Sequence, residues 1–340
     1  MKHKIICTLG PSSLNKNIIL KLKDLGVDIF RINLSHTNYS NLKSTIHFLK
    51  KLKIKNICID TEGAQVRTTK VKRKIFFNIN QKVKVYNSKI KNTNNKINLY
   101  PKFKLNLCKE NTVIRIGFNN LTLKVIKVSL NFLDCKVITE GYLESNKGVH
   151  FSRNIKLPAL TDKDKKSINL AMNEGIKFYA MSFVNYSSDI LLIRKLIGKK
   201  SFLISKIETL NSLKNLNKIS NLSDALLIDR GDLSRYIEIE TIPLVQEKIA
   251  KKIKNKNKQL YVATNLLETM IKDKQPTRAE SHDIYSTLKQ GVSGLVLAAE
   301  TAIGKYPKES LTLLKKIIKV YYNKNYYFNS APNKSFIRWE

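Results

Sequence analysis

The stretch FLISKIE, residues 202–208, carries the clearest signal for the fold of this 340-residue chain. It is a mostly apolar run of strand length that ends with the charged side chains Lys206 and Glu208. Similar runs recur along the chain, with segments of helical spacing between them. The expected strands are 4–9, 27–34, 56–59, 178–183, 202–207, 225–228, 260–263 and 294–298. Eight nearly continuous apolar strands that alternate with helices predict an α/β fold, a parallel (β/α)8 TIM barrel.

One interval interrupts this alternation. Between about residues 69 and 156, β-branched and polar residues alternate in short runs that polar turn clusters separate. This pattern predicts an inserted all-β domain. The expected organisation is a first barrel part at 1–68, an inserted β-barrel lid domain at 69–156, a second barrel part at 157–320 and a C-terminal tail at 321–340.

The net charge of +36 at first indicates a polyanion such as nucleic acid as the partner. However, only ten of the 62 basic residues are arginine, the residue that nucleic-acid readers favour, and the lysines are scattered. A joint excess of Lys, Asn and Ile is what AT-rich codons would supply. We therefore do not expect nucleic acid as a partner, although a non-catalytic nucleic-acid-binding protein stays an alternative.

Other classes of protein are excluded by the apolar and cysteine patterns. No run approaches the ~18 apolar residues of a membrane-spanning helix, and the N-terminus lacks the pattern of a secretory signal. Four widely spaced cysteines without a CxxC pair indicate reduced thiols and hence a cytoplasmic protein.

Polar side chains gather after the expected strands, where TIM barrels carry their chemistry. They are Arg31, Asn33, Ser35, His36, Asp60, Thr61, Arg67, Lys206, Glu208, Arg230, Gly231, Asp232, Thr264, Glu300 and Thr301. Glu208 and Asp232, on neighbouring strands, offer oxygen ligands that suit Mg²⁺ or Mn²⁺. Arginines and Lys206 beside them would neutralise a phosphoryl group. The residues predict a metal-assisted reaction on an anionic, phosphorylated small substrate, without fixing which one.

Seven ordered segments resemble the pyruvate kinase family. They are 4–13 (KIICTLGPSS), 31–36 (RINLSH), 60–68 (DTEGAQVRT), 157–164 (LPALTDKD), 204–208 (ISKIE), 230–233 (RGDL) and a block at 263–307 that contains AT, PTRAE and AETAIGKYP. The resemblance implies phosphoryl transfer from phosphoenolpyruvate to ADP, which gives pyruvate and ATP in the last step of glycolysis.

The resemblance also implies a role for individual residues. Lys206, Thr264, Arg31 and Arg67 would be catalytic, and Arg31, Lys206, Gly231, Asp232 and Thr264 would contact the substrate. Asn33, His36, Arg67 and Lys163 would lie on the nucleotide side. Glu208 and Asp232 would bind Mg²⁺ or Mn²⁺, and Asn33, Ser35, Asp60 and Thr61 would bind K⁺.

Several positions depart from the family pattern. Gln65 replaces a glutamate that accompanies K⁺ dependence, so the need for K⁺ stays open, and Glu62 replaces a common lysine. Asp229 stands where the family has a small residue, near the methylene end of the substrate. Its charge would repel an anionic substrate unless it pairs with Arg230 or Arg235.

Two further expectations follow from the resemblance. The family's C-terminal regulatory domain would be absent, and assembly into a homo-oligomer would run through the barrel. The alternative activity is a Mg²⁺-dependent lyase acting on an oxo-acid, because a Glu/Asp metal pair in a barrel also serves enolate chemistry.

Overall fold

A computed structural model describes residues 3–63, 65–88, 90–117, 121–153, 155 and 157–323 of the chain. The expected tail therefore lies outside the described residues from position 324 onward, as does the predicted domain boundary at 156. The chain forms two compact units, one of Met1–Thr61 with Lys166–Glu340 and one of Glu62–Lys165.

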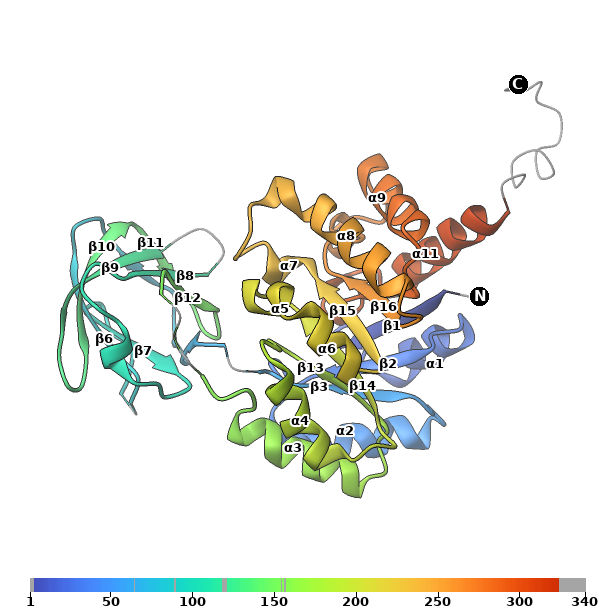
Figure 1. Ribbon diagram of the computed structural model, residues 1–340, viewed down its shortest axis with the longest axis horizontal. Helices are drawn as coiled ribbons and strands as arrows, with labels where there is room; N and C mark the ends of the chain where they lie inside the picture. Colours follow the sequence, from blue (N-terminus) through green and yellow to red (C-terminus); the bar gives the residue numbers. More distant parts are fainter. Residues whose placement is uncertain are drawn as a thin grey trace. The chain divides into compact units, whose positions relative to one another are not determined.

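The first unit contains a closed barrel of eight parallel strands, with helices on its outside (Figure 1). In barrel order the strands are β1 (Lys4–Leu9), β17 (Gly294–Leu297), β16 (Gln259–Ala263), β15 (Ala225–Asp229), β14 (Phe202–Ile207), β13 (Phe178–Met181), β3 (Ile57–Asp60) and β2 (Ile29–Asn33). The predicted TIM barrel is thus confirmed. The bounds of β1 and β14 are those predicted, and the other strands differ by one or two residues at one end or, for β2 and β3, at both ends.

Amphipathic helices connect the strands and bury one face against them. They are α1 (Lys16–Asp24), α2 (Tyr39–Lys51), α3 (Asp162–Asn173), α4 (Ser187–Ile197), α5 (Leu210–Lys214), α6 (Leu216–Leu222), α7 (Arg230–Leu233), α8 (Ile242–Lys254), α9 (Arg278–Lys289), α10 (Ala299–Ala302) and α11 (Pro307–Tyr322), with 3₁₀ turns η2 (Ile239–Thr241) and η3 (Glu268–Ile271). The start of α9 is fixed by a capping box, in which Thr277 Oγ1 accepts from the Glu280 amide and the Glu280 carboxylate accepts from the Thr277 amide.

The inside of the barrel consists of an apolar layer followed by a charged one. The apolar layer includes Ile29, Cys58, Ile204 and Leu227, and also Ile6, Ala180, Ala225, Tyr261, Ala263 and Val296. Side chains on a strand alternate between its two faces, so the residue two positions further along also faces inward. In four strands that residue is charged, and these residues are Arg31, Asp60, Lys206 and Asp229. Strand periodicity therefore brings charges from distant segments together at the C-terminal end of the barrel.

The second unit is built almost entirely of β-structure. A seven-stranded sheet has the order β12 (Val149–Phe151), β8 (Val113–Ile116), β9 (Leu121–Val128), β10 (Leu133–Thr139), β6 (Lys82–Tyr86), β7 (Lys96–Tyr100) and β4 (Arg67–Thr68), and β11 (Gly141–Leu143) pairs with β5 (Ile75–Phe77). Its only described helical elements are the 3₁₀ turn η1 (Leu105–Leu107) and the first residues of α3. Its core is apolar and includes Phe77, Val85 and Leu123.

The β unit is longer than the predicted insert of 69–156, because the segments that flank the insert bind each other. The amides of Glu62 and Gly63 donate to the Asp164 carboxylate at 2.8 and 3.2 Å, and Thr161 Oγ1 donates to Glu62 Oε1 at 2.8 Å. These bonds tie residues 62–63 to residues 161–164 within one compact unit.

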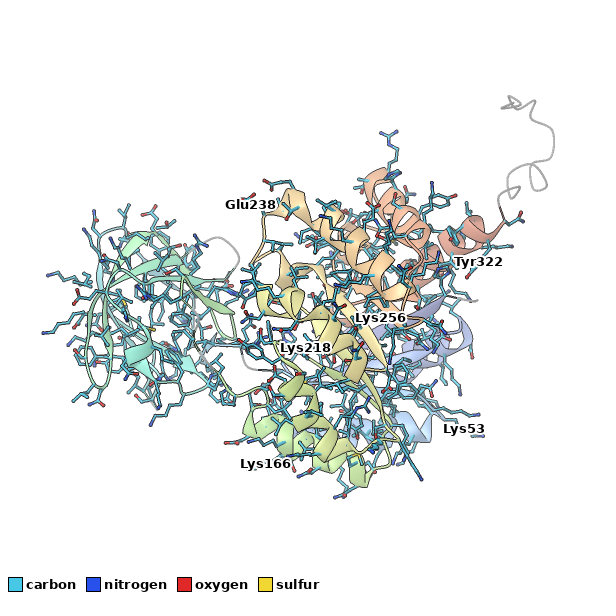
Figure 2. The ribbon with its side chains drawn as sticks, viewed as in Figure 1. Lys53, Lys166, Lys218, Glu238, Lys256 and Tyr322 are labelled. Carbon is cyan, nitrogen blue, oxygen red and sulfur yellow. The ribbon has the colours of Figure 1, made fainter. Side chains whose placement is uncertain are left out.

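The lysines of the first unit come from many separate segments (Figure 2). Of those labelled there, Lys53 follows α2, Lys166 lies in α3, Lys218 lies in α6 and Lys256 follows α8. None of the helices in the described part of the chain has the length and apolar character needed to cross a bilayer.

A substitution at Gly294 tests how closely the strands β1 and β17 of the barrel approach each other. A Cβ at this position would lie 2.3 Å from the carbonyl oxygen of Lys4, which pairs with Gly294 across β1 and β17. Because two backbones would have to separate, we expect Gly294→Ala to destabilise the barrel by about 3 kcal/mol. Urea denaturation followed by circular dichroism measures this change.

Gly175→Ala is the matched control for this prediction. Gly175 has a φ of 72°, but a Cβ there would meet no atom within 4 Å. Only the left-handed backbone opposes this substitution, at a cost of about 1 kcal/mol. Equal stability of the two variants would contradict the packing described for β1 and β17.

Candidate active site

The ammonium group of Lys206 lies at the centre of a buried cluster inside the barrel. Its Nζ is 2.8 Å from Glu208 Oε1, 3.2 Å from Asp229 Oδ2 and 3.6 Å from Asp60 Oδ2, and it donates to Ser182 Oγ at 3.2 Å. Burial lowers the pKa of Lys206, but the three carboxylates outweigh burial and raise it above its ordinary value. The ammonium therefore keeps its charge in the interior.

A second buried cation, Arg31, extends the cluster towards β1 and β3. Its Nη1 lies 3.4 Å from Asp60 Oδ2, and its Nε donates to Thr8 Oγ1 at 2.9 Å. Thr8 in turn donates to the carbonyl of Leu297 at 3.0 Å. The guanidinium is thereby fixed in orientation by two neighbouring strands.

Three carboxylates lie close together at the ends of β14 and β15. Glu208, Asp229 and Asp232 each offer an oxygen, and these three atoms lie within 4.8 Å of one another. Burial raises the pKa of Glu208 to about 8, with Asp232 and Asp229 adding to the rise and Lys206 opposing it. Burial would also raise the pKa of Asp229, but the charge of Lys206 and a hydrogen bond from Thr264 lower it to about 2.

The carboxylate group fits a hard divalent cation. It offers oxygen ligands only, which Mg²⁺ and Mn²⁺ prefer. The buried Oε1 of Glu208 faces the Lys206 ammonium at 2.8 Å, and no other group in the described part of the chain donates a hydrogen bond to it. Three carboxylates converge here, those of Glu208, Asp229 and Asp232, and of the nearby cations Lys206 pairs with the first two and Arg235 lies 3.6 Å from the third. A divalent cation would bind where these three carboxylates approach one another.

Thr264, directly after β16, has a strained backbone with a φ of 76°. Its carbonyl accepts from Arg230 Nε at 3.0 Å and from Nη2 at 2.7 Å, and Nη2 also reaches the carbonyl of Asn265 at 3.0 Å. Nη1 of Arg230 is anchored by both oxygens of Asp283 on α9, at 2.9 and 2.7 Å. This clamp holds the Thr264 hydroxyl 2.5 Å from Asp229 Oδ1, to which it donates.

The residues expected to bind K⁺ come from the ends of two neighbouring strands. Asn33 of β2 pairs in register with Asp60 of β3, and Asn33 Oδ1 accepts from the Ser35 amide at 2.9 Å. Thr61 Oγ1 accepts from the Ser182 amide at 3.0 Å. The amide of His36 donates to the Asn33 carbonyl at 3.1 Å, and the His36 side chain is exposed.

The predicted residues Arg67 and Lys163 belong to the β unit, as do the first residues after Thr61. Arg67 lies in β4, where its Nη1 donates to the carbonyl of Asn146 at 3.4 Å. Lys163 Nζ is 3.1 Å from Glu62 Oε2, so the glutamate that departs from the family pattern has a cationic partner within its own unit.

Asp229 pairs with neither of the two arginines, Arg230 and Arg235, that the sequence offers as possible partners. Asp229 pairs with Lys206, whereas Arg230 binds Asp283 and Arg235 Nε lies 3.6 Å from Asp232. The reason is strand alternation, since Asp229 occupies an inward position and its neighbour Arg230 does not.

Two strand-end residues stabilise the fold. The Glu300 carboxylate accepts from the amides of Leu267 and Ala298, and Thr301 Oγ1 donates to the carbonyl of Thr8 at 2.9 Å. Sequence reasoning missed Thr8, Ser182 and Asp283. Thr8 and Ser182 could have been predicted from strand periodicity, because each lies two positions after an inward apolar residue, Ile6 and Ala180 respectively.

The fold and the cluster define a (β/α)8-barrel protein with a buried lysine beside three neighbouring carboxylates. Residues 1–311 match the family described as "Pyruvate kinase, barrel domain". The chain is 34% identical over 332 residues to the pyruvate kinase of Thermotoga maritima, covering 93% of this chain and 70% of that protein. It is 32% identical over 329 residues to the pyruvate kinase of Sporosarcina psychrophila, covering 93% of this chain and 56% of that protein. The chain therefore belongs to the pyruvate kinase family, as its motifs indicate, and spans little more than half the length of the Sporosarcina protein.

Asp60 provides a test of the buried cluster. Its carboxylate faces two cations, Arg31 and Lys206, whose side chains are each 5% exposed. Asp60→Ala leaves both with less compensating charge, so we expect it to destabilise the barrel by about 3–5 kcal/mol in urea denaturation.

The control is Asp162→Ala, which removes a carboxylate that is 92% exposed and lies 3.5 Å from Lys165. Exposed pairs contribute little, so this variant should unfold like the unaltered protein. If Asp60→Ala behaves in the same way, the cluster does not depend on the charge of Asp60.

Proposed function

We propose that this chain is a pyruvate kinase, a phosphotransferase that moves the phosphoryl group of phosphoenolpyruvate to ADP and releases pyruvate and ATP. The observation that carries this proposal is the buried Lys206 ammonium, which lies beside three carboxylates whose oxygens are within 4.8 Å of one another. Membership of the pyruvate kinase family supports the same reaction.

Glu208 and Asp232 would hold Mg²⁺ or Mn²⁺ in this site. A bound divalent cation supplies positive charge that polarises substrate oxygens and stabilises an enolate. The support from this chain is the oxygen-only donor set of three neighbouring carboxylates.

The chain's own residues would bind and position the phosphoryl group. In the reaction the P–O bond to enolpyruvate breaks, a P–O bond to the terminal phosphate oxygen of ADP forms, and the enolate left behind takes a proton at its methylene carbon. Such transfer depends mainly on positioning and electrostatic stabilisation. Lys206 and Arg31 would neutralise the phosphoryl oxygens.

Thr264 and the 231–232 turn would contact the enolpyruvate part of the substrate. A Cβ at Gly231 would lie 2.9 Å from the methyl carbon Cγ2 of Thr264, so a larger residue would force the Thr264 side chain to move. The Arg230 clamp fixes Thr264, and its hydroxyl would face the carbon that gains the proton.

The nucleotide and K⁺ sites keep the assignments implied by the resemblance. Asn33, His36, Arg67 and Lys163 would contact ADP, and Asn33, Ser35, Asp60 and Thr61 would bind K⁺, with Gln65 leaving the K⁺ requirement open. The β unit would act as a lid that excludes water. Homo-oligomerisation through the barrel stays a prediction. A cytoplasmic location is supported by four cysteines that are all buried free thiols.

A coupled assay tests the proposed activity. With Mg²⁺ and K⁺ present, we expect pyruvate formation from phosphoenolpyruvate that requires ADP and yields ATP. Lys206→Met should lower kcat by at least about 10³-fold, because the main cation on the transferred group is lost. Lys218→Met, which removes an exposed lysine from α6, should leave the rate unchanged.

Two outcomes would contradict the proposal. No ATP formation by a folded protein that binds Mn²⁺ would favour the lyase alternative, and near-normal turnover by Lys206→Met would remove Lys206 from the reaction. Binding of RNA or DNA at ~150 mM salt would favour the nucleic-acid alternative.

A further inference from the structure

Asp229 adds a negative charge to the inside of the barrel at a position where its role is not explained by packing. It lies two residues after Leu227 of the apolar layer. The corresponding positions, two residues after the apolar-layer residues Tyr261 and Val296, are occupied by the small residues Ala263 and Ala298. Its carboxylate is held from two sides, by the Thr264 hydroxyl at 2.5 Å and by Lys206 at 3.2 Å. Asp229 is therefore a fixed part of the site.

The surroundings of Lys206 show what this charge does to an incoming anion. An ammonium has three N–H groups, and three oxygens already lie within 3.2 Å of Nζ, those of Ser182, Glu208 and Asp229. An oxyanion that binds Lys206 must displace one of them or share its N–H group. Asp229 also repels the anion, which the neutral Ser182 does not.

The surroundings of Glu208 and Asp232 show the opposite effect on a cation. An oxygen of Asp229 lies within 4.8 Å of an oxygen of each of these residues. A third carboxylate at this distance strengthens the attraction for a divalent cation, whether or not it contacts the ion.

We propose that Asp229 sets the charge balance of the site, strengthening the binding of a divalent cation and weakening the binding of an oxyanion at Lys206. The inference rests on the cation site of the proposed function. Its consequence is that a bound cation favours anion binding, because it offsets the three carboxylates that lie within 4.8 Å of one another.

The experiment uses the full chain with Asp229→Asn, which keeps the size of the side chain and an oxygen for Thr264 but removes the charge. Mn²⁺ binding is measured by electron paramagnetic resonance, and oxalate is then titrated calorimetrically into the Mn²⁺-saturated protein. We expect Mn²⁺ to bind about tenfold more weakly and oxalate about tenfold more tightly than in the unaltered protein.

Two further variants serve as controls. Asp229→Ala also vacates the position next to Lys206 and should bind oxalate at least as tightly as Asp229→Asn. Glu238→Gln removes an exposed charge (Figure 2) and should change neither affinity. Circular dichroism shows whether each variant is folded.

Each other outcome overturns the inference. Unchanged Mn²⁺ affinity, or oxalate binding that weakens in Asp229→Asn, would show that Asp229 acts only in the structure of the site. In both cases the unaltered protein still binds Mn²⁺, so the cation site survives. If the unaltered protein binds no Mn²⁺, the cation site fails and this inference fails with it.

Discussion

The site depends on one buried charge, the ammonium of Lys206 inside a barrel whose adjoining layer is apolar. A charge at this depth is stable only with compensating groups. Asp60, Glu208 and Asp229 provide them from β3, the end of β14 and β15. The rest of the site follows from this requirement, because groups that stabilise the ammonium also create a concentration of carboxylates that attracts a cation.

Asp229 contributes to the charge balance of the site, at a position where the resemblance to pyruvate kinases implies a small residue. Its carboxylate binds both Lys206 and Thr264. Thr264 itself is held in a strained conformation by Arg230, which Asp283 anchors from α9. The strain persists because these groups fix the backbone from several sides. The proposed cation site, Lys206 and Thr264 are therefore linked through the side chain of Asp229.

The sequence predicts the barrel well, because its strands are apolar runs of distinct length and its helices have a different period. It also predicts that Lys206, Glu208 and Asp232 lie near one another, since the ends of parallel strands meet at one edge of a barrel. The two-residue strand period explains why Asp229 faces the same interior as Lys206, a partner that was not predicted from the sequence, which offered only Arg230 and Arg235 as possible partners. The bond between Arg230 and Asp283 has no comparable signal, because it joins a turn to a helix about fifty residues away and depends on tertiary packing.

The most direct test of this account is a crystal structure of the chain grown with Mn²⁺, with anomalous diffraction used to locate the ion. The account predicts one strong anomalous peak inside the C-terminal end of the barrel, in bonding distance of carboxylate oxygens of Glu208 and Asp232. A fully occupied ion bound elsewhere, with Glu208 still turned towards Lys206 alone, would contradict it.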